Sequence, residues 1–178
     1  MKIVLNKDFF LRPLCELDVD GNYPLWFNDL LVTKYSSHGK FFKSKNFFKK
    51  YILELDEEKN LVLAIMHNRK HIGNISLQNI SFLDQNAELA IILGEKKYWG
   101  KGVGLKASIE ICRHGFKNLN LKKIYCGTAK NNKGMNSIAK KLGMKIEGVR
   151  KNHLFLNNKF EDLLEYSIFK KEFLKINY

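Results

Sequence analysis

Runs of hydrophobic residues in this chain alternate between the two-residue period of strands and the 3.6-residue period of helices. The pattern predicts strands at residues 9–14, 61–66, 72–80, 87–93, 123–128, 144–149 and 160–169. It predicts helices over a short segment that includes Trp26 and Phe27, and over residues 44–55, 105–116 and 132–142. Because the strand at 87–93 is apolar at nearly every position, we expect it to be central in the sheet.

Residues typical of helix ends and turns punctuate this pattern. Asp18 or Asp20 is expected to cap the short helix, and Gly143 is expected to end the last one in a left-handed conformation. Asn157 and Asn158 are expected to turn the closing strand pair. The predicted order is β-α-α-β-β-β-α-β-α-β-β, which indicates a mixed α/β (α+β) sandwich rather than a series of βαβ units.

Composition limits the class of protein. The 178 residues, 45% of them hydrophobic, suit one folded domain over residues 1–178. The net charge of +13 suits an anionic partner, although lysines that only solubilise the surface would give the same number. Three cysteines without metal-ligand spacing predict neither a disulfide framework nor a metal site. Without a signal peptide or an apolar membrane span, we expect a cytoplasmic protein that does not contact a membrane.

The segment Tyr98–Gly104 (YWGKGVG) carries three glycines at alternate positions between a strand and a helix. Glycines there let backbone N–H groups and a helix N-terminus approach a diphosphate. A dinucleotide fingerprint is disfavoured because no acidic residue lies between Glu110 and Glu147. A P-loop is disfavoured because Gly102, not Ser or Thr, follows Lys101. A tight turn without a ligand is the remaining alternative.

Three segments in order resemble the GNAT N-acetyltransferase superfamily: the glycine segment just described, Asn132 followed by Lys141–Met144 (KLGM), and Leu11–Leu14 (LRPL). The resemblance covers nearly the whole chain, and the Trp-Gly-Lys-Gly variant is most similar to the branch that acetylates ribosomal proteins, polyamines and nucleotide sugars. It implies a GNAT-like, mostly antiparallel central sheet flanked by helices, with acetyl-CoA as the co-substrate.

The resemblance also assigns residues to acetyl-CoA. Backbone groups of the glycine loop would bind the diphosphate, a β-strand would pair with pantetheine, and an asparagine would lie near the pantetheine arm. These residues are Trp99, Gly100, Lys101, Gly102, Val103, Gly104, Ile91, Ile92, Leu93 and Asn132. Trp99 stands where many relatives have Gln or Arg, and Asn132 could equally be an ordinary helix N-cap.

Two residues are candidates for proton transfer. Glu88 lies in an otherwise apolar strand and is the leading candidate for the base, acting through water; a solvent-facing or ion-paired glutamate is the alternative. Many relatives protonate the departing thiolate with a tyrosine where this chain has Ala139. Ser137, a nearby tyrosine or water would then serve, or the thiolate leaves unassisted; an ordinary helix-surface role is favoured for Ser137.

The acceptor pocket of the superfamily lies between the first two helices and the last hairpin. The candidate acceptor-binding residues there are Asn28, Asp29, Tyr35, His38 and Asp162. For the two aspartates a cap or turn role is the favoured alternative, and a loop histidine is more often simply exposed.

Together these observations predict an acetyl-CoA-dependent N-acetyltransferase that acts by direct transfer, without metal or covalent intermediate. The preferred acceptor is a small amine such as a nucleotide-linked amino sugar. A protein N-terminus, as on a ribosomal protein, is the alternative, and polyamines fit a basic protein less well. A non-catalytic acyl-CoA sensor is also considered. We expect no direct nucleic-acid binding, and a homodimer is left open.

Overall fold

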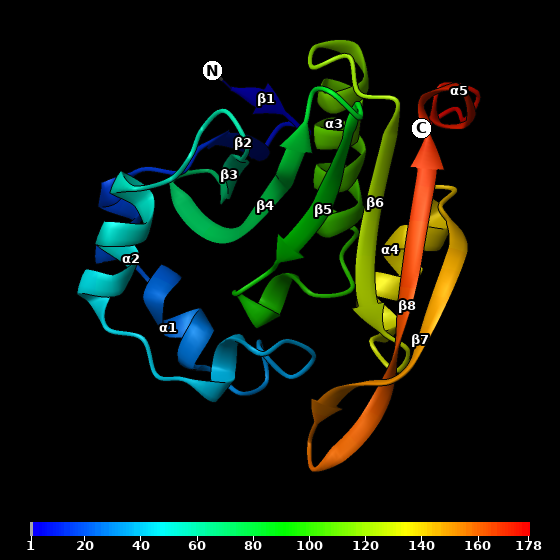
Figure 1. Cartoon of the computed structure of the whole chain (residues 1–178). Helices are drawn as coiled ribbons and strands as arrows, with labels where there is room; N and C mark the ends of the chain where they lie inside the picture. Colours follow the sequence, from blue (N-terminus) through cyan, green and yellow to red (C-terminus); the bar gives the residue numbers. More distant parts are fainter. Residues whose placement is uncertain (1) are drawn as a thin grey trace.

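The computed structural model describes residues 2–178. Its centre is one eight-stranded sheet (Figure 1). The strands lie in the order β1-β2-β3-β4-β5-β6-β8-β7, and every neighbouring pair is antiparallel except β5 and β6, which are parallel. Their bounds are β1 (Ile3–Val4), β2 (Phe9–Pro13), β3 (Leu61–His67), β4 (Lys70–Ser81), β5 (Asn86–Ile92), β6 (Lys123–Ala129), β7 (Lys145–Leu156) and β8 (Lys159–Phe169). The predicted mixed, mostly antiparallel sheet is confirmed.

Helices cover both faces of this sheet. They are the 3-10 helices η1 (Glu16–Asp20), η2 (His38–Lys40) and η3 (Lys96–Tyr98) and the α-helices α1 (Tyr23–Asn28), α2 (Lys45–Leu53), α3 (Val103–Lys117), α4 (Lys133–Lys141) and α5 (Lys170–Phe173). Figure 1 shows α1 and α2 beside the N-terminal half of the sheet, and α3 and α4 together beside β5, β6 and β8. None of the helices between residues 2 and 178 has the length and apolar character needed to cross a membrane.

The side chains of β5 show which helices lie on which face. Ile91 packs with the main core, and its Cδ1 lies 3.3 Å from the position of a Cβ at Gly104 of α3. Ile92, the next residue, packs instead with the smaller cluster of Val19, Tyr23, Trp26 and Phe48 under α1 and α2. Successive side chains of a strand point to opposite faces, so α1 and α2 lie across the sheet from α3 and α4.

Several helix and turn ends fall where the sequence predicts them. The side chain of Ser44 accepts a hydrogen bond from the amide of Phe47 at the start of α2. Gly143 has φ +75° after α4, and Asn157 and Asn158, with φ of +50° and +61°, turn β7 into β8. β7 continues well beyond the predicted end at Val149, and the short α5 at the end of the chain was not predicted.

The predicted cap of the short helix is wrong. Asn22 occupies the N-cap position of α1, and Asp20 instead pairs with Lys45. Asp18 is buried within the preceding turn, η1, where its carboxylate accepts a hydrogen bond from the Cys15 amide and pairs with Arg12. The sequence pattern suggested a cap because both aspartates precede the helix, but Asp18 is held by residues that precede it and Asp20 by Lys45 of α2.

Candidate active site

The glycine loop joins the end of β5, through η3, to the N-terminus of α3. Gly100 and Gly102 have φ of +72° and +77°, a region that other residues adopt only with strain. Gly102 is the N-cap of α3 and offers no side chain to the first N–H groups of the helix. These N–H groups and the positive end of the helix dipole therefore face outward, as an anion site requires. Lys101 and Lys106 are exposed beside them.

Gly104 has a different reason for lacking a side chain. It is buried, and a Cβ there would lie 3.2 Å from Ile138 of α4 and 3.3 Å from Ile91 of β5. The third glycine of the motif thus lets α3 pack closely against α4 and the central strand. Two glycines shape the loop, and one positions the helix behind it.

Two aromatic residues anchor this loop to the sheet. Tyr98 is buried, and its hydroxyl lies 2.9 Å from Nδ1 of His67 in β3. The indole N–H of Trp99 donates to the backbone carbonyl of Leu93, 2.6 Å away, while 44% of the residue stays exposed. Trp99 therefore braces the loop against the end of β5 instead of adding a polar side chain to the diphosphate site.

The parallel strands β5 and β6 pair only at their N-terminal ends, where Asn86, Ala87 and Glu88 face Lys123, Ile124 and Tyr125. Beyond Glu88 the two strands separate, and Figure 1 shows the gap widening toward the glycine loop. Side chains and ligands can enter such a divergence, and the edge of β5 facing β6 is left without a strand partner along Ile91 and Ile92.

Backbone direction along this free edge suits an extended ligand. The carbonyl of Ile92 points toward β4, because a Cβ at Gly73 would lie 2.5 Å from it. Successive carbonyls alternate in direction, so that of Ile91 points to the free edge, whereas that of Leu93 already accepts the indole N–H of Trp99. This is the arrangement that strand addition by an amide-bearing arm requires.

Glu88 lies at the apex of the divergence, on the face opposite α3. Its neighbours Ala87 and Leu89 are buried against the main core, whereas Glu88 is half-buried and points the other way, as do Ala90 and Ile92. Its Oε2 accepts a hydrogen bond of 3.2 Å from Nδ2 of Asn79. Within residues 2–178 no cation forms an ion pair with it, so the ion-pair alternative finds no support.

Helix α4 contributes polar residues beside the divergence. The side chain of Asn132 is its N-cap and accepts from the amide of Met135 at 3.2 Å, which confirms the capping role. Ser137 is exposed on the helix surface, and Ala139 is fully buried in the main core. The position at which many relatives are expected to carry a tyrosine thus holds a small side chain that packs in the core.

The residues proposed for the acceptor divide by how their side chains are held. Asn28 forms two hydrogen bonds with the backbone of Lys43, and Asp29 accepts from the amides of Leu31 and Val32 and pairs with Lys96 at 2.6 Å. Asp162 is held by Lys151 and by the amide of Asn152, opposite an irregular stretch of β7. These contacts match a cap role for Asp29, the C-cap of α1, whereas Asp162 lies within β8 and is neither a cap nor a turn residue.

Tyr35 and His38 are less constrained. Tyr35 is half-buried, and His38 begins η2 with its ring edge-on to Phe27 at a centroid separation of 5.2 Å. Partial burial of the ring and then the nearby charge of Lys43 lower the pKa of His38, which favours the neutral imidazole. Both residues lie in the connection between α1 and α2.

Cys112 and Cys126 are unsuited to act as nucleophiles. Cys112 and Cys126 are buried in the main core, and burial raises the pKa of both thiols, that of Cys126 to about 12. A thiolate is the reactive form of cysteine, so these side chains are unreactive at neutral pH. Among the described residues no cluster of His, Cys, Asp or Glu has the arrangement of a metal site.

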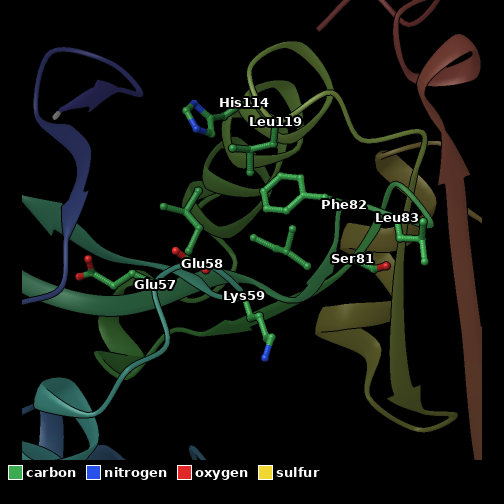
Figure 2. A pocket seen from close by; sticks show the side chains of 10 residues that line it. Glu57, Glu58, Lys59, Ser81, Phe82, Leu83, His114 and Leu119 are labelled. Carbon is green, nitrogen blue, oxygen red and sulfur yellow. The ribbon is translucent and has the colours of Figure 1, made fainter.

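Two cavities lie elsewhere on the molecule. One of about 400 Å³ extends from the start of the β5–β6 pairing over β8 and β7; its lining is Asn86, Lys123, Tyr125, Glu147, Glu165 and Tyr166. A second, of about 750 Å³, lies at the far end of α3 from the glycine loop, around Phe82, His114 and Leu119 (Figure 2). The sequence patterns pointed to neither, because both depend on strand neighbours that are distant along the chain.

Comparison with known proteins agrees with this geometry. The model of the acetyltransferase (GNAT) domain family matches residues 8–145, and the chain belongs to this family. The spermidine N(1)-acetyltransferase of Escherichia coli K12 is 28% identical over 167 residues, covering 92% of this chain and 87% of the relative. The chain is accordingly an acetyl-CoA-dependent N-acetyltransferase.

Two solved structures share the fold at lower identity. A ribosomal L7/L12 alpha-N-protein acetyltransferase in complex with coenzyme A has a TM-score of 0.86 at 16% identity, covering 95% of this chain and 98% of that one. A spermidine N-acetyltransferase from Vibrio cholerae, in complex with CoA and spermine, has a TM-score of 0.85 at 21% identity, covering 95% and 99%. The predicted branch of the superfamily is confirmed, and the acceptors of these proteins differ from one another.

Proposed function

We propose that the enzyme acetylates a primary amine carried by an anionic small molecule, of which a nucleotide-linked amino sugar is the preferred example. The observation that carries this proposal is the lysine segment, residues 30–53, which contains six lysines and no Asp or Glu. A cationic segment attracts an anionic acceptor and repels a polyamine. A cytoplasmic location, as the sequence predicts, is part of the proposal.

The lysine segment borders the proposed acceptor face. It begins after α1, is tied back to Asn28 through the backbone of Lys43, and reaches the β7–β8 hairpin, where Nζ of Lys40 lies 5.9 Å from the ring centre of Phe155. In Figure 1 this connection lies between α1 and the tip of that hairpin. An acceptor that enters from this side would meet these lysines first.

A protein N-terminus is the second candidate acceptor. Large apolar side chains are exposed in the same region, including Phe41 (75%), Phe42 (88%) and Phe160 (65%). Side chains of this kind are typical of surfaces that contact other proteins. The surrounding lysines would then favour an acidic protein.

Direct transfer needs a site for acetyl-CoA, a base for the amine and donors for the oxyanion. The glycine loop and the N-terminus of α3 would hold the diphosphate of acetyl-CoA, and the free edge of β5 would pair with its pantetheine arm. Glu88 would take the proton of the amine through a water molecule as the nitrogen attacks the thioester. Backbone N–H groups at the edge of β5 would stabilise the oxyanion.

The acceptor is tested by thiol release from acetyl-CoA with four amines: a nucleotide-linked amino sugar, the same sugar without the nucleotide, spermidine, and a peptide with a ribosomal-protein N-terminus. We expect kcat/KM to be highest for the nucleotide-linked sugar and to fall as salt is raised, because salt screens the lysines. Lys34→Glu with Lys40→Glu should lower it about tenfold through KM, which corresponds to ~1.4 kcal/mol.

Lys117→Glu, an exposed substitution at the end of α3, is the matched control and should leave kcat/KM unchanged. A preference for spermidine would refute the anionic acceptor. Preference for the peptide would select the second candidate.

A further inference from the structure

We propose that Tyr125 is the acid that protonates the departing thiolate, opposite the base Glu88. This inference rests on the proposed function, because it assumes that Glu88 accepts the proton of the amine at the same site. It assigns the proton donor for the departing thiolate, which the sequence left open.

Tyr125 faces the place where the strands part. It is paired with Glu88 in the parallel register of β5 and β6, and this is the last pair before the strands separate. Its neighbours Ile124 and Cys126 are buried in the main core, so the ring of Tyr125 points to the opposite face, the same face as Glu88. Adjacent strands lie about 4.8 Å apart, which brings the two side chains together.

The hydroxyl group of Tyr125 is available. The hydroxyls of Tyr98, Tyr166 and Tyr178 contact His67, Asn136 and Leu142. Tyr125 is half-buried, lines the cavity of about 400 Å³ over β6, β8 and β7, and its hydroxyl has no hydrogen-bond partner among residues 2–178. A substrate that reaches the apex can therefore accept a hydrogen bond from it.

Two neighbouring proton donors on this face, one on β6 and one on β8, are paired or buried. Nζ of Lys123 pairs with Glu147 at 2.6 Å, and Ser167 is buried between the strands. The charged groups that face the phenol are Glu88 on β5, Lys123 on β6, Glu147 on β7 and Glu165 on β8. Burial, and then the charge of Glu88, raise the pKa of Tyr125, so the phenol keeps its proton at neutral pH.

The proposed step is balanced. The amine nitrogen forms a bond to the carbonyl carbon as its proton passes through water to the carboxylate of Glu88. The carbon–sulfur bond breaks, and the phenol of Tyr125 gives its proton to the sulfur. The carboxyl of Glu88 then returns a proton to the phenolate, so that amide and free thiol leave an unchanged enzyme.

The test is the pH profile of kcat for the wild type and for Tyr125→Phe, Glu88→Gln and the control Tyr178→Phe. A general acid contributes about 10²–10⁴-fold, so Tyr125→Phe should lower kcat about 100-fold while KM for acetyl-CoA changes less than twofold. The wild-type profile should be bell-shaped. Tyr125→Phe should remove its decline at high pH, whereas Glu88→Gln should lower kcat and keep that decline.

Tyr178→Phe, which removes a hydroxyl that donates to the carbonyl of Leu142 after α4, should keep both limbs. Incorporation of 3-fluorotyrosine at position 125 preserves size and acidifies the phenol, and should shift the high-pH limb to lower pH. The inference is overturned if Tyr125→Phe keeps kcat within twofold of the wild type, or if fluorination leaves that limb in place. A wild type that binds acetyl-CoA but acetylates no amine would instead refute the proposed function.

Discussion

Asp18 is buried where β2, η1 and β4 meet, and its carboxylate contacts two basic side chains. Oδ2 accepts from Nη1 of Arg12 at 2.7 Å, and Oδ1 lies 3.2 Å from Nδ1 of His71. His71 in turn packs against Trp26, at a centroid separation of 4.9 Å, and Trp26 covers Gly94 just beyond β5. The carboxylate of Asp18 thus supports α1, whose Trp26 packs against Gly94 just beyond β5.

Asp18→Asn should destabilise the protein by about 3 kcal/mol, because it leaves Arg12 without its buried counter-charge. Burial alone would raise the pKa of Asp18, but the hydrogen bonds from Arg12 and the Cys15 amide, with His71 close by, outweigh burial and hold the pKa well below its usual range. A carboxylate with a lowered pKa stabilises the fold above an unfolded pKa of about 3.9 and loses this contribution as the pH falls.

Urea unfolding between pH 7 and pH 3 measures this effect. The wild type should lose stability below about pH 4 more steeply than the variant. Asp20→Asn, at the exposed pair with Lys45, is the control and should change little. Equal pH dependence in wild type and Asp18→Asn would show that the Asp18 network does not act as described.

Helix α3 and the loop before it are the element proposed to bind the diphosphate of the cofactor. A substitution at Gly102 places a Cβ where φ is +77°, so Ala would cost about 1–2 kcal/mol in strain. The same methyl group would also stand at the N-cap of the helix, where the diphosphate is proposed to bind. Gly102→Ala should weaken CoA binding at least tenfold.

Calorimetric titration with CoA checks this, with thermal unfolding to record the strain. Gly21→Ala is the control, because Gly21 has φ −92° and a Cβ there would meet only the carbonyl of Asp18, at 3.6 Å. If Gly102→Ala binds CoA as tightly as Gly21→Ala, the loop is not the diphosphate site.

The positions of α3 and its neighbours could be predicted because their signals are local. Three glycines mark the loop, apolar spacing marks the helix, and Asn132 caps α4. The pairing of Glu88 with Tyr125 could not be predicted in the same way, because the two residues come from strands separated by a whole helix. The one visible signal is that Tyr125 alternates with Ile124 and Cys126, which indicates that it faces away from the core.

At the scale of the whole molecule, charge and connectivity act together. The net charge of +13 is spread over the chain, yet the lysine segment concentrates it where α1, α2 and the β7–β8 hairpin approach one another. The parallel pairing of β5 and β6 within an otherwise antiparallel sheet ends at Glu88 and Tyr125, and the two strands separate beyond this pair. Sequence could predict the order of the strands along the chain, but not that β8 would come to lie between β6 and β7.

The central claim is that acetyl-CoA occupies the free edge of β5 and the glycine loop, and not the cavity around Phe82 and His114. Hydrogen exchange of the backbone amides, with and without acetyl-CoA, locates the contact residue by residue. The account predicts slowed exchange at Ile91, Leu93 and residues 99–104, and unchanged exchange at residues 81–83 and 114–119. Slowed exchange at the second set with none at the first would contradict it.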